Sequence, residues 1–132
     1  MSRTVAFCCI VAFVFAAFPA PADAATYTIH GTVAVRGGVA LEDCSGADDQ
    51  SDIHQGTRVR LQDRDDHVIA RARLGVGRAG GGGIERCLFR FTMRDVRSSP
   101  TYTFLLAERT DGRTVTRTRL ANHDWRVTLT PT

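Results

Sequence analysis

Apolar and polar side chains alternate along residues 86–93, and this two-residue repeat decides which secondary structure the segment can form. Cys87, Phe89, Phe91 and Met93 fill one set of alternate positions, and Leu88, Arg90 and Thr92 fill the other. Successive side chains of a β-strand point to opposite faces of a sheet, so the pattern predicts a strand with one face buried and the other in solvent. A helix would repeat its apolar positions every three or four residues instead.

The same alternation returns at short intervals along the rest of the chain. It occupies residues 25–35, 57–63, 68–74, 101–109, 113–120 and 125–129, with Gly, Pro, Ser and Asp in the breaks. No segment has a convincing helical repeat. About seven short strands joined by turns predict an all-β, antiparallel sandwich or barrel, and we expect the sandwich.

Residues 57–63 and 68–74 are spaced to form a hairpin whose register can be derived. A two-residue turn at Asp65–Asp66 brings the apolar positions of both strands onto one face, although Asp accepts the required positive backbone angles less readily than Gly. The same register sets like charges opposite each other on the outer face. The predicted pairs are Leu61 with Ala70, Val59 with Ala72, Arg60 with Arg71, and Arg58 with Arg73.

Opposed like charges destabilise a sheet, so these arginines require a compensating group. One candidate is a set of carboxylates on a neighbouring strand. The other is an anionic partner, such as a phosphate or carboxylate polymer of the cell envelope. The candidate anion-binding residues are Arg58, Arg60, Arg71 and Arg73.

Composition limits the range of partners. All 17 basic residues are arginine, a usage that the codon preference of a genome rich in G and C explains more simply than selection for anion binding. The formal net charge is only +3. Nucleic-acid binders carry a basic stripe, so we expect no nucleic-acid partner.

The first 24 residues have the pattern of a secretory signal. Arg3 supplies a positive charge, Val5–Phe18 is an apolar run of 14 residues, and Ala22–Ala24 forms an Ala-x-Ala cleavage site. A membrane-spanning helix needs about 20 apolar residues, so the run is too short for an anchor. We expect cleavage after Ala24 and one exported domain, residues 25–132, without a transmembrane segment.

Two of the four cysteines, Cys44 and Cys87, remain in the expected mature chain. Export brings them into an oxidising compartment, which predicts a disulfide between them. Closing a loop of about 44 residues lowers the entropy of the unfolded chain, which stabilises the folded domain by up to about 4 kcal/mol. Without a CxxC pair or a Cys/His cluster, neither redox catalysis nor a structural zinc site is expected.

Residues 36–56 form the longest predicted loop, and it is rich in acids. Asp48, Asp49 and Asp52 offer oxygen ligands for Ca²⁺, but the segment lacks the glycine and distal glutamate of an EF-hand, and a solvated acidic loop is the alternative. Residues 75–80 match the GxGxxG pattern. Because Gly81–Gly83 follow where a dinucleotide site needs a helix, we interpret this segment as a loop between strands.

Catalytic patterns are missing from the sequence. It contains no GxSxG elbow, no HExxH motif and no spaced carboxylate pair, so we expect a protein that is not an enzyme and has no cofactor. The histidines, His30, His54, His67 and His123, have no ligand spacing and are expected at the surface.

The segments CSGADDQSDIHQGTRVRLQD (44–63), HVIARARLGVG (67–77) and CLFRFTMRDV (87–96), with the closing TRTRL and Trp125, carry a resemblance that covers nearly all of the mature chain. Together they resemble a family of small secreted proteins from high-GC Gram-positive bacteria. The resemblance implies an immunoglobulin-like or transthyretin-like β-sandwich, a Cys44 to Cys87 pairing and export. It transfers no catalytic residue. The chain departs from the family at Asp66, where the family tends to have glycine, and at residues 110–112, which replace a shorter turn of the family.

These observations predict an exported, monomeric, non-catalytic β-sandwich that acts as a binding or cell-envelope interaction module. Its partner is then an unidentified protein or an envelope polymer. The alternative is a carrier of anionic ligands that uses the arginine-bearing sheet face, with the acidic loop as a calcium site.

Overall fold

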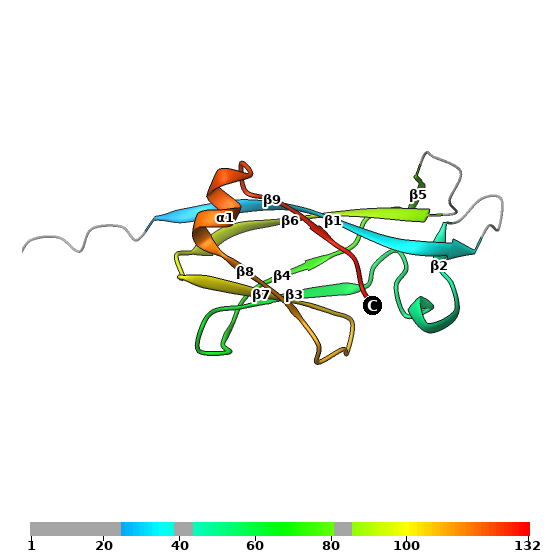
Figure 1. Cartoon of the computed structure of the whole chain (residues 1–132), viewed down its shortest axis with the longest axis horizontal. Helices are drawn as coiled ribbons and strands as arrows, with labels where there is room; N and C mark the ends of the chain where they lie inside the picture. Colours follow the sequence, from blue (N-terminus) through cyan, green and yellow to red (C-terminus); the bar gives the residue numbers. More distant parts are fainter. Residues whose placement is uncertain (1–24, 39–43, 81–85) are drawn as a thin grey trace, which may run out of the picture.

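The computed structural model describes residues 25–38, 44–80 and 86–132, which form nine strands, one α-helix and one short 3-10 helix (Figure 1). The expected signal segment, residues 1–24, lies outside the described residues. The elements are β1 (Thr26–Gly38), β2 (Ser45–Gly46), η1 (Asp48–Gln50), β3 (Arg58–Gln62), β4 (Val68–Arg73), β5 (Arg78–Ala79), β6 (Arg86–Arg97), β7 (Thr101–Leu106), β8 (Arg113–Thr116), α1 (Arg117–Asn122) and β9 (Arg126–Leu129). In this part of the chain no helix has the length and apolar character to cross a membrane.

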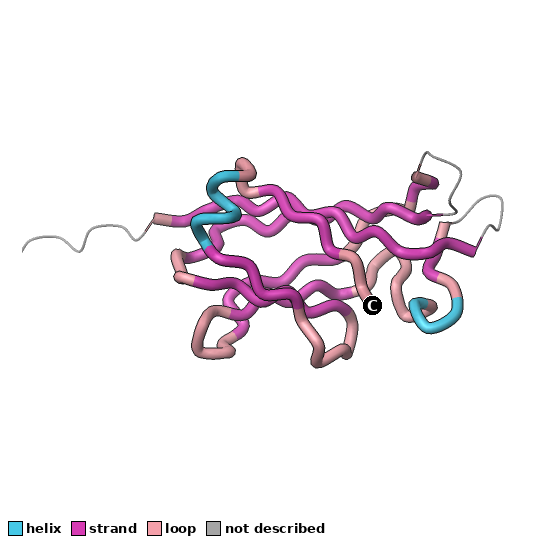
Figure 2. Tube along the Cα trace, viewed as in Figure 1, coloured by secondary structure: helices cyan, strands magenta, loops and turns pink. Residues whose placement is uncertain are grey.

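The strands form two sheets, which lie face to face as two layers (Figure 2). One, the β1–β6 sheet, has the order β2-β1-β6-β5, and β9 also pairs with β1. The other, the β3–β7 sheet, has the order β4-β3-β7-β8. The structure is therefore mostly β, with two largely antiparallel sheets, as predicted, but its described residues form nine strands where about seven were expected.

The pairing of β9 with β1 departs from the antiparallel prediction. Residues 30–33 pair in parallel with residues 126–129, whereas the other strand pairs described here are antiparallel. The physical reason is the connection between β8 and β9. It passes through α1 and carries the chain from the β3–β7 sheet to the β1–β6 sheet, so β9 does not follow β8 in a hairpin.

The helix α1 also corrects the prediction that residues 113–120 form one strand. The side-chain oxygen of Thr116 accepts a hydrogen bond from the Arg119 N–H at 3.2 Å, which caps the first turn of the helix. Leu120 is 1% exposed and packs into the core. One cap and one buried side chain hold a helix too short to show a periodic pattern.

The core lies between the sheets and is filled by alternate residues of the strands. In β6 the inward side chains are those that the alternation selected, and Phe89 and Phe91 are 0% and 4% exposed. Gly31 on β1 leaves room for one of these rings, because a Cβ at Gly31 would lie 1.9 Å from Cζ of Phe91. The sequence pattern therefore identifies the buried face of the central strand correctly.

The β3–β4 hairpin confirms the predicted register and corrects the predicted turn. Both arginine pairs and both apolar pairs form as expected. The connection, however, holds three residues, Arg64–Asp66, and of these only Asp66 has a positive φ, of 62°. A register shift between Leu61 and Gln62 absorbs the additional residue. A three-residue turn ending in a left-handed residue needs a single positive backbone angle, which suits a turn that lacks glycine.

Two further contacts tie the loops to the core. The predicted disulfide joins Cys44 to Cys87 and fixes the segment between β1 and β2 to β6. At the β6–β7 corner, the buried hydroxyl of Tyr102 donates to the Arg97 carbonyl oxygen at 3.1 Å and accepts from the Ser99 N–H at 3.0 Å. Burial raises the pKa of Tyr102, so the hydroxyl keeps its proton and remains a donor.

Candidate anion-binding site

The four arginines selected from the sequence lie together on the outer surface of β3 and β4. We call Arg58, Arg60, Arg71 and Arg73 the arginine face. Val59 and Leu61, which alternate with them in β3, are fully buried on the inner side. Arg58 lies directly opposite Arg73, and Arg60 lies directly opposite Arg71. Three of these side chains are exposed and Arg60 is half-buried.

Backbone carbonyl groups, and not neighbouring acids, contact this face. The residue that pairs with Arg60 on β7 is Leu105, an apolar residue. The Arg60 Nη2 donates to the carbonyl oxygens of Ala107 at 3.1 Å and Arg109 at 3.3 Å. Ala107 has a φ of 49°, so the chain turns sharply where these carbonyls are presented. Carbonyl oxygens orient the guanidinium, but they do not neutralise its charge.

A backbone carbonyl group also contacts Arg73, at the edge of the arginine face. The Arg73 Nη1 donates to the Gly56 carbonyl oxygen at 3.0 Å. Among the described residues, no carboxylate oxygen lies within 4.0 Å of any of the four guanidinium groups. The described part of the chain therefore does not provide carboxylates on a neighbouring strand, which was one of the two compensating groups considered from the sequence.

Most of the acids that the structure describes lie outside the strands, and the ion pairs that they form are with residues outside the arginine face. Asp63, at the β3–β4 turn, accepts from the Arg97 Nη2 at 2.9 Å. Burial acts to raise the pKa of Asp63, but the backbone N–H groups of His67 and Asp65 and the Arg97 guanidinium outweigh it and hold the pKa below its ordinary value. This carboxylate is therefore ionised and already engaged at the end of the sheet.

Of the three proposed calcium ligands, the structure describes the side chains of Asp49 and Asp52. The Asp52 carboxylate accepts from the Arg109 Nε at 2.9 Å and Nη2 at 2.8 Å, and this guanidinium lowers the pKa of Asp52. Asp49 is exposed, and its carbonyl oxygen accepts from Arg109 at 2.9 Å. Asp48 lies in η1, but its side chain is outside the description. In the described ranges, no group of three His, Cys, Asp or Glu side chains is arranged to hold a metal ion.

A hollow at the open edge of the sandwich was not anticipated from the sequence. It has a volume of about 580 Å³ and lies between β8 and β9, with Arg113, Arg119, His123 and Arg126 among its lining residues. The Arg113 Nη1 crosses this edge and donates to the Thr128 carbonyl oxygen at 2.6 Å. The residues meet only because α1 carries the chain between sheets, so alternation within one strand offers no signal for them.

Comparisons with known proteins add no assignment to this geometry. No protein-family model, no curated protein and no solved structure matches the chain.

Proposed function

We propose that this chain is an exported, non-catalytic binding module that binds linear phosphate polymers of the cell envelope through its arginine face. The proposal includes the immunoglobulin-like or transthyretin-like architecture that the sequence resemblance implies. The sandwich provides the rigid support, and the ligand provides the charge that the face lacks.

One observation carries the proposal. Two cross-strand arginine pairs occupy the outer side of β3 and β4, and no carboxylate of the described residues reaches them. Such pairs destabilise an unliganded sheet, and a bound polyanion reverses the sign of the interaction. The same arrangement that costs stability in the free protein therefore favours binding.

The arrangement of the guanidinium groups favours phosphate over carboxylate. The two oxygens of a carboxylate lie in one plane and match a single guanidinium fork. Phosphate oxygens are directed tetrahedrally, so two guanidinium groups that face each other across strands can each bind one of them. A linear polymer supplies such groups in series, as a ladder of two arginine pairs requires.

The test is a titration of isotope-labelled protein, residues 25–132, with short linear polyphosphate, followed by NMR. We expect the amide resonances of β3 and β4 to shift. Counterion release contributes about −0.7 to the slope of log K against log salt for each phosphate contact, so four contacts predict a slope of about −3. Substituting Arg58→Thr together with Arg73→Thr should lower the slope to about −1.5.

Arg117→Ala with Arg119→Ala is the matched control, because it removes the same charge from α1 and leaves the arginine face intact. Its β3–β4 shifts and slope should equal those of the unmodified protein. The proposal is refuted if the β3 and β4 resonances do not respond, or if the control loses as much affinity as the Arg58/Arg73 variant. Equal affinity for polyglutamate would assign the face to carboxylate polymers instead.

A further inference from the structure

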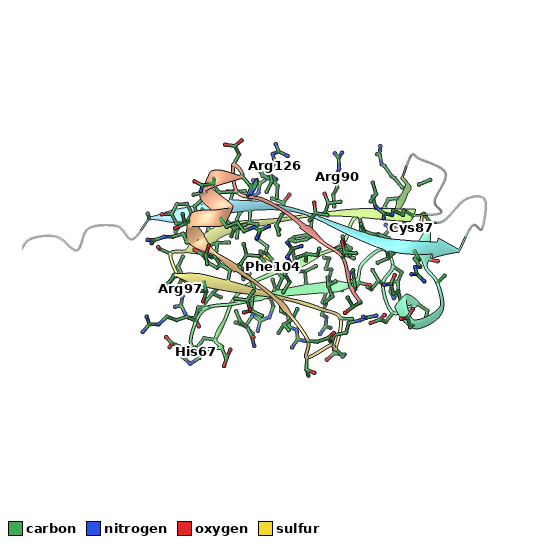
Figure 3. The ribbon with its side chains drawn as sticks, in the orientation of Figure 1. His67, Cys87, Arg90, Arg97, Phe104 and Arg126 are labelled. Carbon is green, nitrogen blue, oxygen red and sulfur yellow. A yellow bond between two sulfur atoms is a disulfide. The ribbon has the colours of Figure 1, made fainter. Side chains whose placement is uncertain are left out.

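A second group of arginines lies on the outer surface of the β1–β6 sheet, on the other side of the sandwich. We call this group the opposite face; it consists of Arg36, Arg78, Arg86, Arg90 and Arg126, all of them exposed. Figure 3 shows Arg90 and Arg126 projecting from this layer, away from the other sheet. The two arginine groups therefore point in opposite directions.

The strand register accounts for the grouping on the opposite face. Arg36 lies directly opposite Arg86, a third cross-strand arginine pair. Arg90 pairs with Thr32, and His30 lies between Arg126 on β9 and Thr92 on β6. The remaining outward positions of β1 and β9 are largely threonines, whose hydroxyl groups can donate to an anion.

The opposite face also lacks neutralising acids within the described residues. The outward positions of β1, β5 and β9 hold no Asp or Glu, and the one acid of β6, Asp95, forms no ion pair with a described residue. No carboxylate that the structure describes lies within 4.0 Å of the guanidinium groups of this face. The modest net charge of +3 thus arises from two cationic faces combined with acids that lie mainly in the loops.

The surface between the two faces is uncharged on the outer side of β7 and β8 and along residues 74–77, whereas the hollow between β8 and β9 is lined by Arg113, Arg119 and His123. On the β7–β8 side, the outward residues are threonines and Leu105, at 101, 103, 105, 114 and 116. On the other side, residues 74–77, which lead from β4 toward β5, are Leu, Gly, Val and Gly. Because the two faces belong to different sheets and point in opposite directions, a single straight polymer segment contacts one face at a time.

From this geometry we propose that the protein is bivalent and cross-links phosphate polymers by binding a separate segment on each face. The inference rests on the proposed function of the arginine face and adds a second site and a bridging activity. Packed sheets lie about 10 Å apart, so the two bound segments are held close together but on opposite sides of the core.

The test mixes the intact domain, residues 25–132, with long-chain polyphosphate and follows light scattering over a range of protein-to-polymer ratios. Cross-linking predicts a maximum at an intermediate ratio and a decline with excess of either component. Tripolyphosphate, which is too short to join two proteins, should compete and dissolve the assemblies. Excess polymer saturates each face separately, which accounts for the decline on that side.

Two variants remove one face each. Arg90→Thr with Arg126→Thr disrupts the opposite face, and Arg58→Thr with Arg73→Thr disrupts the arginine face. We expect each variant to scatter at least tenfold less than the unmodified protein while still binding polyphosphate on a column. The Arg117→Ala, Arg119→Ala variant keeps the full signal.

The outcomes separate the two proposals. Binding at β3 and β4 without a scattering maximum overturns bivalency and leaves the proposed function standing. Failure of the β3 and β4 resonances to respond to short polyphosphate overturns the proposed function itself. Full scattering by either face variant overturns the assignment of the two faces.

Discussion

Replacing Arg71 by glutamate should stabilise the fold and weaken phosphate binding at the same time. Arg71 is exposed and lies directly opposite Arg60, and its guanidinium forms no ion pair with a described residue. Opposed like charges destabilise, and opposed unlike charges stabilise, by about 0.2–1 kcal/mol each. Replacing the repulsive Arg60–Arg71 pair by an attractive Arg60–Glu pair therefore raises the free energy of unfolding by about 1 kcal/mol. For a domain of this length, that corresponds to an increase in Tm of about 4 °C.

Thermal unfolding by circular dichroism at low and high salt measures this effect. Arg71→Gln removes the repulsion without adding an attraction, so its increase in Tm should be about half as large. In 1 M salt the Debye length falls to about 3 Å, and both increases should shrink. Saturating polyphosphate should raise the Tm of the unmodified protein more than that of R71E. An unchanged or lower Tm of R71E at low salt would show that the two charges do not interact, which removes the electrostatic reason for an anion here.

Three other substitutions test the contacts that hold the sandwich together. Tyr102→Phe leaves the Ser99 N–H without its partner and should lower the free energy of unfolding by about 1–3 kcal/mol in urea titrations; a loss under 0.5 kcal/mol contradicts the role given to this hydroxyl. Asp52→Asn breaks the ion pair with Arg109. Because the Asp52 side chain is 41% exposed, the free energy of unfolding should fall by only about 0.5–1 kcal/mol. Because the folded state lowers the pKa of Asp52, the difference in free energy of unfolding between the unmodified protein and Asp52→Asn should be complete above about pH 4 and vanish as the pH falls further. Unfolding curves at several pH values measure it. A difference independent of pH would assign the loss to something other than charge. Replacing both cysteines of the disulfide by serine should cost up to about 4 kcal/mol, and the fold should survive at low temperature if the core alone specifies it, as near-UV circular dichroism will report.

The local features of the fold were predictable because they depend on alternation along single strands. The buried positions of β6 and the register of the β3–β4 hairpin both follow from side chains two residues apart. The turn was less predictable. The turn has one residue more than predicted, and the register shift between Leu61 and Gln62 compensates for it. The strand pairs beyond Leu61 are therefore the same as for a two-residue turn, and the apolar pattern cannot distinguish the two turns.

Features that depend on how the sheets meet could not be derived in this way. α1 is held by a threonine cap and by the burial of Leu120, and neither produces a repeat in the sequence. The opposite face combines residues of β1, β5, β6 and β9, so it becomes visible only when the strand order is known. For the arginine face, the sequence identified the residues, but the carbonyl groups that contact Arg60 come from a loop 47 residues along the chain.

The parallel pairing of β1 with β9 has a consequence for how the molecule acquires its structure. The first and last strands of the domain are neighbours, so the β1–β6 sheet cannot be completed until the C-terminal residues are available. A chain that emerges N-terminus first must therefore keep one edge of β1 unpaired until residues 126–129 have emerged. Contacts of such long sequence separation slow folding. The order of the strands thus delays completion of the β1–β6 sheet until β9 is available to pair with β1.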